Sequence, residues 1–251
     1  MNEPAKRRRS WLGLLLPALL AFLVLAGLGT WQLKRKAWKE SLIAELNERL
    51  AAPPAALPAP ATWPRLDPAG EEYRRVKFDA EFDNAKEALV YAAASAFRPD
   101  ASGNGYGYWV FTPARLAGGA TVMVNRGFVP DARRGPASRA QGQMTGPVEI
   151  VGALRWPEPG HWFSPHDDPA HNLWFVRDPA AIAAAKGLGP VAPFYVEQET
   201  PMPPGGLPQP GKLVVNLRNA HLQYAITWYG LALALVVVFA AYAFNSHREL
   251  R

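Results

Sequence analysis

The sequence predicts a membrane protein of the α+β class, in which two transmembrane helices flank a β-rich extracytoplasmic domain, barrel-like or a sandwich. Two long runs, Trp11–Gly29 and Leu222–Phe244, contain no charged residue, and a helix needs roughly 20 such residues to cross the hydrocarbon core. A core helix of a soluble protein rarely stays uncharged over such a length. Between the two runs, short stretches alternate apolar and polar side chains and are separated by glycines and prolines, which is typical of compact β folds.

The first run follows a basic tail, residues 1–10, with Lys6, Arg7, Arg8 and Arg9. A basic cluster can bind nucleic acid, but one that directly precedes an apolar helix is typical of a cytoplasmic flank, so no nucleic-acid partner is expected. The run exceeds the apolar part of a signal peptide and continues as a helical pattern. We therefore expect a retained anchor rather than a cleaved signal.

The orientation of the protein in the membrane is predicted from the basic residues that flank the two apolar runs. The second run ends with Arg248 and Arg251, which favours a cytoplasmic C-terminus, as the tail does for the N-terminus. No Arg- and Ser-rich transit peptide fits before Trp11. These features predict a bacterial plasma membrane protein with both termini in the cytoplasm and the large domain outside.

Two segments connect the first helix to the domain. Residues 31–51 place Trp38, Leu42, Leu46 and Leu50 near one helical face, an amphipathic extension. Six prolines between Pro53 and Pro68 then predict a stiff spacer without regular structure. The predicted parts are a basic cytoplasmic tail (1–10), transmembrane helix one (11–30), the extension (31–51), a Pro-rich linker (52–70), the β-rich domain (71–218), transmembrane helix two (219–244) and a cytoplasmic tail (245–251).

The domain is predicted to hold seven strands and one helix. In the first strand, apolar Val76 and Ala80 alternate with polar Lys77 and Glu81. A helix is expected over 178–189, capped by Asp178 and ended by a glycine. The strands are expected at 76–82, 87–93, 106–113, 120–128, 146–156, 194–199 and 212–217.

Several chemistries find little support. The chain has no cysteine, which excludes disulfides, thiolate metal sites and covalent haem attachment. No nucleophile elbow or phosphate-binding loop is present. The histidines 161, 166 and 171, with Asp167 and Asp168, resemble a metal cluster, but their spacing matches no metal motif and their context is that of a surface loop. A metal-dependent hydrolase is therefore the weakest of the functional alternatives.

A basic segment, "VNRGFVPDARRG", begins at the end of the fourth predicted strand and continues into a predicted turn with Arg133 and Arg134. Its simplest interpretation is a turn, with Gly127 at positive φ and Arg126, Arg133 and Arg134 in water. The alternative is a basic lip that meets a carboxylate, a phosphate headgroup or an acidic partner.

The stretch "RNAHLQYAITWYG" carries the strongest functional signal. A helix beginning near Asn219 places His221 in its first turn, with Tyr224 and Trp228 on the same stripe and the small Ala225 between them. The helix dipole favours a neutral imidazole there, with a lone pair for iron. The competing explanation is that His, Tyr and Trp are common at membrane interfaces without any ligand. From the residues alone, both explanations stand, as does the question whether Trp31 and Gln32 close a pocket beside His221.

Motifs along the whole chain resemble one family, the Surfeit locus protein 1 family of cytochrome c oxidase assembly factors. The motifs are "GTWQLKRKAWK", "EYRRVKFDAEFD", "GYGYWVFTP", "VMVNRGFVP", "FSPHDDPAHNLWFVRD" and, as the closest match, "RNAHLQYAITWYGLA". Each is weak alone, but their order and spacing are specific. The loop histidines are not part of the family pattern, and Asp167 stands where members often have Asn.

The resemblance implies two transmembrane helices and a role in assembling a haem–copper oxidase, without enzymatic activity. It also implies transient, non-covalent haem a binding with His221 as the iron ligand and Tyr224 and Trp228 as pocket lining. The implied partners are haem a synthase, the oxidase catalytic subunit and membrane lipids. Gly107, Arg126 and Gly127 match signature positions whose role the resemblance leaves unassigned. A haem-free scaffold for the nascent oxidase subunit remains the alternative.

Overall fold

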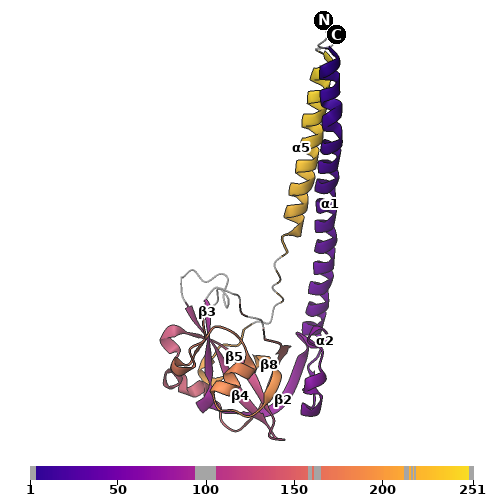
Figure 1. Ribbon diagram of the computed structural model, residues 1–251. Helices are drawn as coiled ribbons and strands as arrows, with labels where there is room; N and C mark the ends of the chain where they lie inside the picture. The colour runs from indigo at the N-terminus through magenta and orange to yellow at the C-terminus, as the bar shows by residue number, and fades with distance from the viewer. Residues whose placement is uncertain are drawn as a thin grey trace. The chain divides into compact units, whose positions relative to one another are not determined.

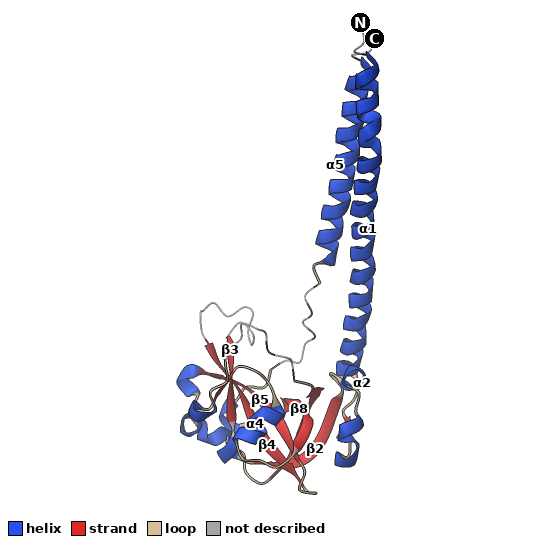
Figure 2. Cartoon of the chain, viewed as in Figure 1, coloured by secondary structure: helices blue, strands red, loops and turns tan. Residues whose placement is uncertain are grey.

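A computed structural model describes residues 4–93, 106–157, 160, 165–211, 215, 217 and 219–248. The chain divides into two units, each of which is described by itself. One unit, here called the helix pair, comprises residues 1–45 and 216–251, and the other, the barrel domain, comprises residues 46–215. Helices and strands are distinguished in Figure 2.

The helix pair consists of α5 (His221–Arg248) and most of α1 (Pro4–Ala51). Both contain windows apolar enough to span a membrane, and only 6% and 11% of these windows are buried. A core helix of a soluble protein would be mostly buried, so the exposed leucines and valines require an apolar solvent. The protein is therefore a membrane protein with two spanning helices, as predicted.

The two helices run antiparallel, so that the start of α1 and the end of α5 lie at the same end of the pair (Figure 1). Small residues line the contact: Gly29 is buried on α1, and Ala225 and Ala232 are 1% and 3% exposed on α5. A Cβ atom at Gly29 would lie 2.9 Å from the Tyr229 ring. Beside it, the Tyr229 and Thr30 hydroxyl oxygens are 2.9 Å apart. Small residues and interhelical hydrogen bonds commonly hold transmembrane helices together.

Helix α1 continues unbroken past its apolar run and ends at Ala51. The predicted helix one and its amphipathic extension are thus one helix. In the extension, Leu46 is 6% exposed and Trp38 is 50% exposed.

Five strands of the barrel domain close into a barrel in the order β2, β6, β8, β5 and β4, because β4 also pairs with β2. The β5–β8 pair is parallel and the other four pairs of the ring are antiparallel. Strands β3 and β7 extend the sheet beyond β4, and β1 lies beside β2. The strands are β1 (Ala55–Ala56), β2 (Arg75–Phe82), β3 (Ala88–Ala93), β4 (Tyr106–Leu116), β5 (Thr121–Pro130), β6 (Pro147–Arg155), β7 (Leu173–Trp174) and β8 (Val191–Thr200).

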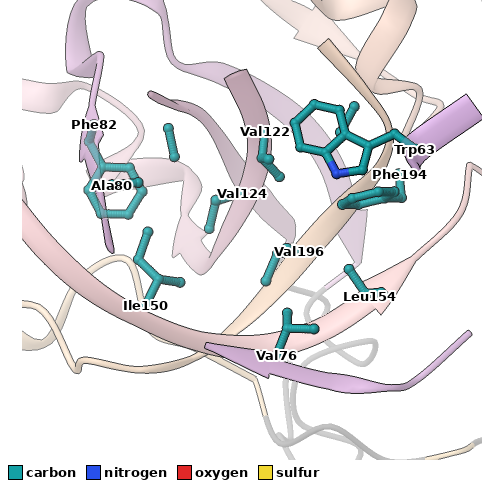
Figure 3. Packing of buried hydrophobic residues seen from close by; sticks show 12 residues of the cluster. Trp63, Val76, Ala80, Phe82, Val122, Val124, Ile150, Leu154, Phe194 and Val196 are labelled. Atoms are coloured by element: carbon teal, nitrogen blue, oxygen red, sulfur yellow. The ribbon is translucent and has the colours of Figure 1, made fainter. Parts of the chain in front are cut away.

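Alternating side chains fill the barrel. On β2, Val76 and Ala80 point into the core while Lys77 and Glu81 are exposed, because successive strand residues face opposite sides. Val124, Ile150, Leu154, Phe194 and Val196 meet them from the other strands (Figure 3). This confirms the β-rich fold and its period-two pattern. The strand predicted at 212–217 lies largely outside the described residues.

The Pro-rich segment does not behave as a free spacer. Strand β1 pairs with β2, the 3₁₀ helix η1 spans Pro60–Arg65, and the short helix α2 spans Pro68–Glu71. Trp63 is 7% exposed and packs edge-on against Phe194, with ring centroids 5.6 Å apart. The expectation of no regular structure here is wrong, because prolines at helix starts and the burial of one large indole outweigh the cost of ordering.

The one helix predicted inside the domain is present as α4 (Pro179–Ala185). The Asp178 carboxylate accepts hydrogen bonds from the backbone N–H groups of Ala180 and Ala181, as expected for an N-cap. Gly187, with φ of +62°, follows its end. Ile182 packs with Trp174 and Tyr195 in a second core cluster.

Candidate functional site

His221 is the first residue of α5, and its side chain is tied to α1. Its Nδ1 atom lies 2.7 Å from Oε1 of Gln32, a residue 189 positions away in sequence. The contact is partly buried. The antiparallel pairing of α1 and α5 brings Gln32 and His221 together, as it also brings together the hydroxyls of Thr30 and Tyr229. The sequence places Gln32 near His221 only as an open possibility, and the structure brings the two together.

This hydrogen bond fixes which imidazole nitrogen carries a proton. An amide oxygen only accepts, so Nδ1 of His221 must donate to Gln32. In a neutral ring the proton then sits on Nδ1, and Nε2 keeps its lone pair. Histidines that bind metals are commonly oriented in this way by an acceptor on the other nitrogen. The helix pair thus presents one oriented imidazole ligand at the start of the second span.

The residues expected to line a pocket lie in two environments. Trp228 and His221 are half-buried, and Ala225 between them is buried. All three lie on the stripe of α5 that faces α1. Tyr224 is 53% exposed. Ala225 is 1% exposed, so the space expected beside this small residue is filled in the structure. Any ring bound at His221 therefore has its open approach on the exposed side of α5.

A shallow depression of about 600 Å³ lies along the first turns of α5. It contains Oδ1 of Asn219, which is buried without a hydrogen-bond partner among the described residues. None of His221, Tyr224 and Trp228 lines it. The lining residues are Asn219, Ala220, Leu222, Gln223, Ile226 and Thr227.

Aromatic and basic residues surround Gln32 on α1. Trp31 and Trp38 are 55% and 50% exposed, and the Arg35 guanidinium lies 4.0 Å from the centroid of the Trp38 ring. Lys36 forms an ion pair of 2.6 Å with Glu40. Exposed tryptophans next to basic side chains are typical of the headgroup layer of a membrane.

The signature residue Arg126 belongs to the barrel domain, and it is fully buried on β5. It donates to Oδ1 of Asn84 at 2.9 Å and to the carbonyl oxygen of Gly142, and its guanidinium lies 4.5 Å from the centroid of the Phe82 ring. Burial lowers the pKa of Arg126 to about 10. The interpretation of this arginine as a water-exposed lip is therefore wrong. It ties three segments of the domain together.

The signature glycines allow close backbone approach. Gly127 has φ of +121°, and a Cβ there would lie 2.1 Å from the carbonyl oxygen of Gln209. A Cβ at Gly107 would lie 2.2 Å from the carbonyl oxygen of Val129. Segment 121–130 is a strand, as predicted for residues 120–128, and the positive φ at Gly127 also agrees with the prediction. Both glycines have a structural role in the domain.

The loop histidines do not converge on a metal site. His171 Nδ1 lies 2.7 Å from the Asp168 carboxylate, and hydrogen bonds from His171 lower the pKa of Asp168. Asp167 accepts from the backbone N–H of Phe175 at 2.6 Å. Among the described residues no group of three His, Cys, Asp or Glu side chains is arranged to hold a metal ion. His161 lies outside the described residues.

One buried ion pair had no sequence signal. Arg139 and Glu87 are 5% exposed each and form two hydrogen bonds. Arg139 also donates to the backbone carbonyls of Arg133 and Arg134. Because Glu87 and Arg139 are far apart in sequence and belong to no recognised motif, this ion pair can be identified only from the structure.

Comparison with known protein families matches residues 19–233 to the SURF1 family. The chain is 40% identical over 234 residues to Surfeit locus protein 1 of Rattus norvegicus, covering 89% of this chain and 72% of that protein. It is 39% identical over 233 residues to Surfeit locus protein 1 of Homo sapiens, covering 89% and 74%. It is 38% identical over 237 residues to that of Takifugu rubripes, covering 89% and 92%. The family match includes both Gln32 and His221.

Proposed function

Because this chain belongs to the SURF1 family, we propose that it assists the assembly of a haem–copper cytochrome c oxidase by carrying haem a. In this proposal the chain receives haem a from haem a synthase, holds it at the outer membrane face and delivers it to the catalytic subunit of the oxidase. Binding is non-covalent, since the chain has no cysteine for a thioether link. The chain makes and breaks no covalent bond in this role, so it is not an enzyme.

The observation that supports haem binding is the hydrogen bond from His221 Nδ1 to Gln32 Oε1. It leaves Nε2 as the nitrogen that can bind iron, and it holds the ring in one orientation. A single imidazole nitrogen, Nε2 of His221, fits a haem better than a bare metal ion, because a bare ion would require several converging ligands. A bound haem would supply the redox chemistry of the future oxidase, and Nε2 of His221 would hold its iron.

The same geometry suits a carrier, which must release its cargo. His221 is only half-buried, and Tyr224 beside it is exposed. A single ligand on an open helix face allows a haem to leave sideways, without the unfolding that a closed cage would require. Exposed Tyr224 and half-buried Trp228 then offer aromatic surfaces against the apolar macrocycle.

For localisation we propose a bacterial plasma membrane with both termini in the cytoplasm and the barrel domain outside. The support is the basic tail before the first span and the basic end of the second. The membrane lipids contact the exposed apolar faces of both helices. The His221–Gln32 pair then lies on the extracytoplasmic side, at the ends of both spans.

One observation favours a haem-free scaffold as the second candidate. The α1-facing side of α5 is closely packed at Ala225, and the depression near the helix start does not include His221. A scaffold would use the helix pair and the barrel domain to hold the nascent oxidase subunit without a cofactor. The hydrolase alternative has no such support from the described residues.

The two candidates differ in the absorption spectrum of the detergent-purified chain after coexpression with haem a synthesis. Haem carriage predicts a Soret band that His221→Ala abolishes, whereas His171→Ala, in an exposed loop, retains it. Membrane insertion should be equal in all three proteins. A colourless wild-type protein would favour the scaffold, and an unchanged band in His221→Ala would exclude His221 as the ligand.

A further inference from the structure

The barrel domain carries an exposed aromatic cluster on the outer face of β3 and β4. Tyr91 stacks on Tyr106 with ring centroids 6.0 Å apart, and it also contacts Tyr108 and Phe175. Tyr91 and Tyr106 are 44% and 47% exposed. Clustered exposed aromatic side chains on a rigid sheet are common at the centres of protein interfaces.

Hydrogen bonds to one carboxylate hold two tyrosines of the cluster in place. The Asp131 carboxylate accepts hydrogen bonds from the hydroxyls of Tyr106 and Tyr108, at 3.2 and 3.1 Å. Asp131 raises the pKa of Tyr106 and burial raises that of Tyr108, while nearby Arg134 acts in the opposite direction on both. Arg134 therefore lies at the border of the cluster.

A depression of about 510 Å³ adjoins this border. Leu89, two residues before Tyr91 on the same face of β3, lies at its edge, and this spacing corresponds to about 7 Å. Arg134 lines the depression as well as bordering the tyrosines. The depression is lined by Asn84, Ala85, Glu87, Leu89, Arg134, Gly135, Pro136, Gln143, His171, Asn172 and Lys186.

The charges of the depression favour a carboxylate. Glu87 is occupied by its buried ion pair with Arg139, and that arginine also fixes the backbone at Arg134. Lys186 donates to Oδ1 of Asn172 at 2.6 Å, which uses one of its three hydrogens. Burial lowers the pKa of Lys186, and the charge of Glu87 acts in the opposite direction, so a further anion beside Lys186 would offset the remaining loss of hydration. The cations of the depression that a ligand can meet are Lys186 and Arg134, of which Arg134 also interacts with Tyr108.

One residue that lines the depression, Gln143, has an acceptor atom without a donor. Gln143 donates through Nε2 toward Glu87, and its Oε1 is buried without a hydrogen-bond partner among the described residues. A ligand with an N–H group close to its carboxylate would satisfy it. A peptide has both, as a backbone amide next to an acidic side chain, whereas a simple dicarboxylate lacks the N–H donor.

We propose that the tyrosine cluster and this depression form one docking surface for an acidic segment of a partner polypeptide. The carboxylate of the segment binds Lys186 and Arg134, its backbone N–H donates to Gln143, and an apolar side chain two or three residues away packs on Tyr91. The surface lies in the barrel domain and uses none of the residues of the proposed haem site.

The test measures fluorescence anisotropy of a labelled peptide, acetyl-Gly-Phe-Gly-Asp-Glu-Gly-amide, with the full chain in detergent. We expect saturable binding that weakens as salt is raised and that is lost when the Asp and Glu of the peptide are replaced by Asn and Gln. Lys186→Gln and Arg134→Gln should each raise Kd by about fivefold, the upper end of what solvent-exposed charge pairs contribute, and Tyr91→Ala should raise it similarly.

Matched controls are Lys77→Gln and Arg115→Gln, whose side chains are exposed elsewhere on the barrel, and His221→Ala. All three should bind the peptide as the wild type does. The proposal is overturned if the acidic peptide does not bind saturably, if the neutral peptide or succinate binds equally well, or if the control variants lose as much affinity as the surface variants. Circular dichroism of each variant establishes that it is folded.

Discussion

Oε1 of Gln32 lies 2.7 Å from Nδ1 of His221, so a residue of the first membrane helix determines which nitrogen of the second helix is available as a ligand. A lone interfacial histidine would be free to rotate and to exchange tautomers. Here the acceptor on α1 selects Nε2 and orients the ring. The hydrogen bond joins the two helices and makes the proposed site a property of the pair.

Gln32→Leu keeps the size of the side chain and removes the acceptor. If Gln32 orients the ligand, this variant should bind haem a about 10- to 100-fold more weakly, the usual effect of losing such a hydrogen bond. The rate of haem transfer from the chain to excess apomyoglobin measures the change. Gln223→Leu, a glutamine at the same end of α5, is the control and should transfer haem at the wild-type rate. Equal rates in both variants would contradict a positioning role for Gln32.

Both spanning helices could be predicted from sequence, because an uncharged run of that length has few alternatives. The strands could be predicted as well, since Val76, Lys77 and Ala80 alternate as a half-buried strand requires. Barrel closure through the β2–β4 pairing could not, because no local pattern encodes which strands meet. The residues of the stretch and the resemblance both pointed to His221, but only the structure shows its contact with Gln32.

The two sequence-based predictions that proved wrong have a common physical cause. Arg126 was expected in water because a single arginine in a glycine-containing segment usually stays hydrated. It is buried because Asn84 and Gly142, distant in sequence, satisfy its N–H groups. The Pro-rich segment was expected to be irregular, yet Trp63 anchors it to the core. In each case long-range packing overrides the local preference.

Arg126→Leu should destabilise the barrel domain by about 2–5 kcal/mol, because it leaves a partly buried acceptor on Asn84 and a buried one on Gly142 without their donor. Arg133→Leu removes an exposed arginine from the adjacent segment and should change stability by less than about 0.5 kcal/mol. Thermal unfolding followed by near-ultraviolet circular dichroism compares them. Equal melting temperatures for the two variants would show that the buried contacts of Arg126 contribute nothing.

Ionisation of Tyr195 should make the free energy of unfolding depend on pH in the alkaline range. Burial raises its pKa from 10.0 to about 12, so the unfolded chain loses this proton at lower pH than the folded one. Its contribution is complete below pH 10 and is lost as pH rises from 10 toward 12, by up to about 3 kcal/mol. Denaturant unfolding between pH 9 and 12 should show this decline, and Tyr195→Phe should reduce it. An identical pH dependence in Tyr195→Phe would refute the assignment.

The proposed orientation can be read with single cysteines, since the chain has none of its own. Ala170→Cys lies in an exposed loop of the barrel domain, and Asn245→Cys is exposed near the end of α5. A membrane-impermeant maleimide added to intact spheroplasts should label the first and not the second. Both should be labelled after lysis. Labelling of Asn245→Cys alone before lysis would mean that the chain has the opposite orientation.

Titration of the purified full chain in lipid nanodiscs with haem a tests the central claim most directly. The account predicts saturation at one haem a per chain, with the Soret shift of an imidazole-bound iron, and loss of this saturable binding in His221→Ala. Stoichiometric binding that persists with the same spectrum in His221→Ala, or a wild-type chain that never saturates, would contradict it.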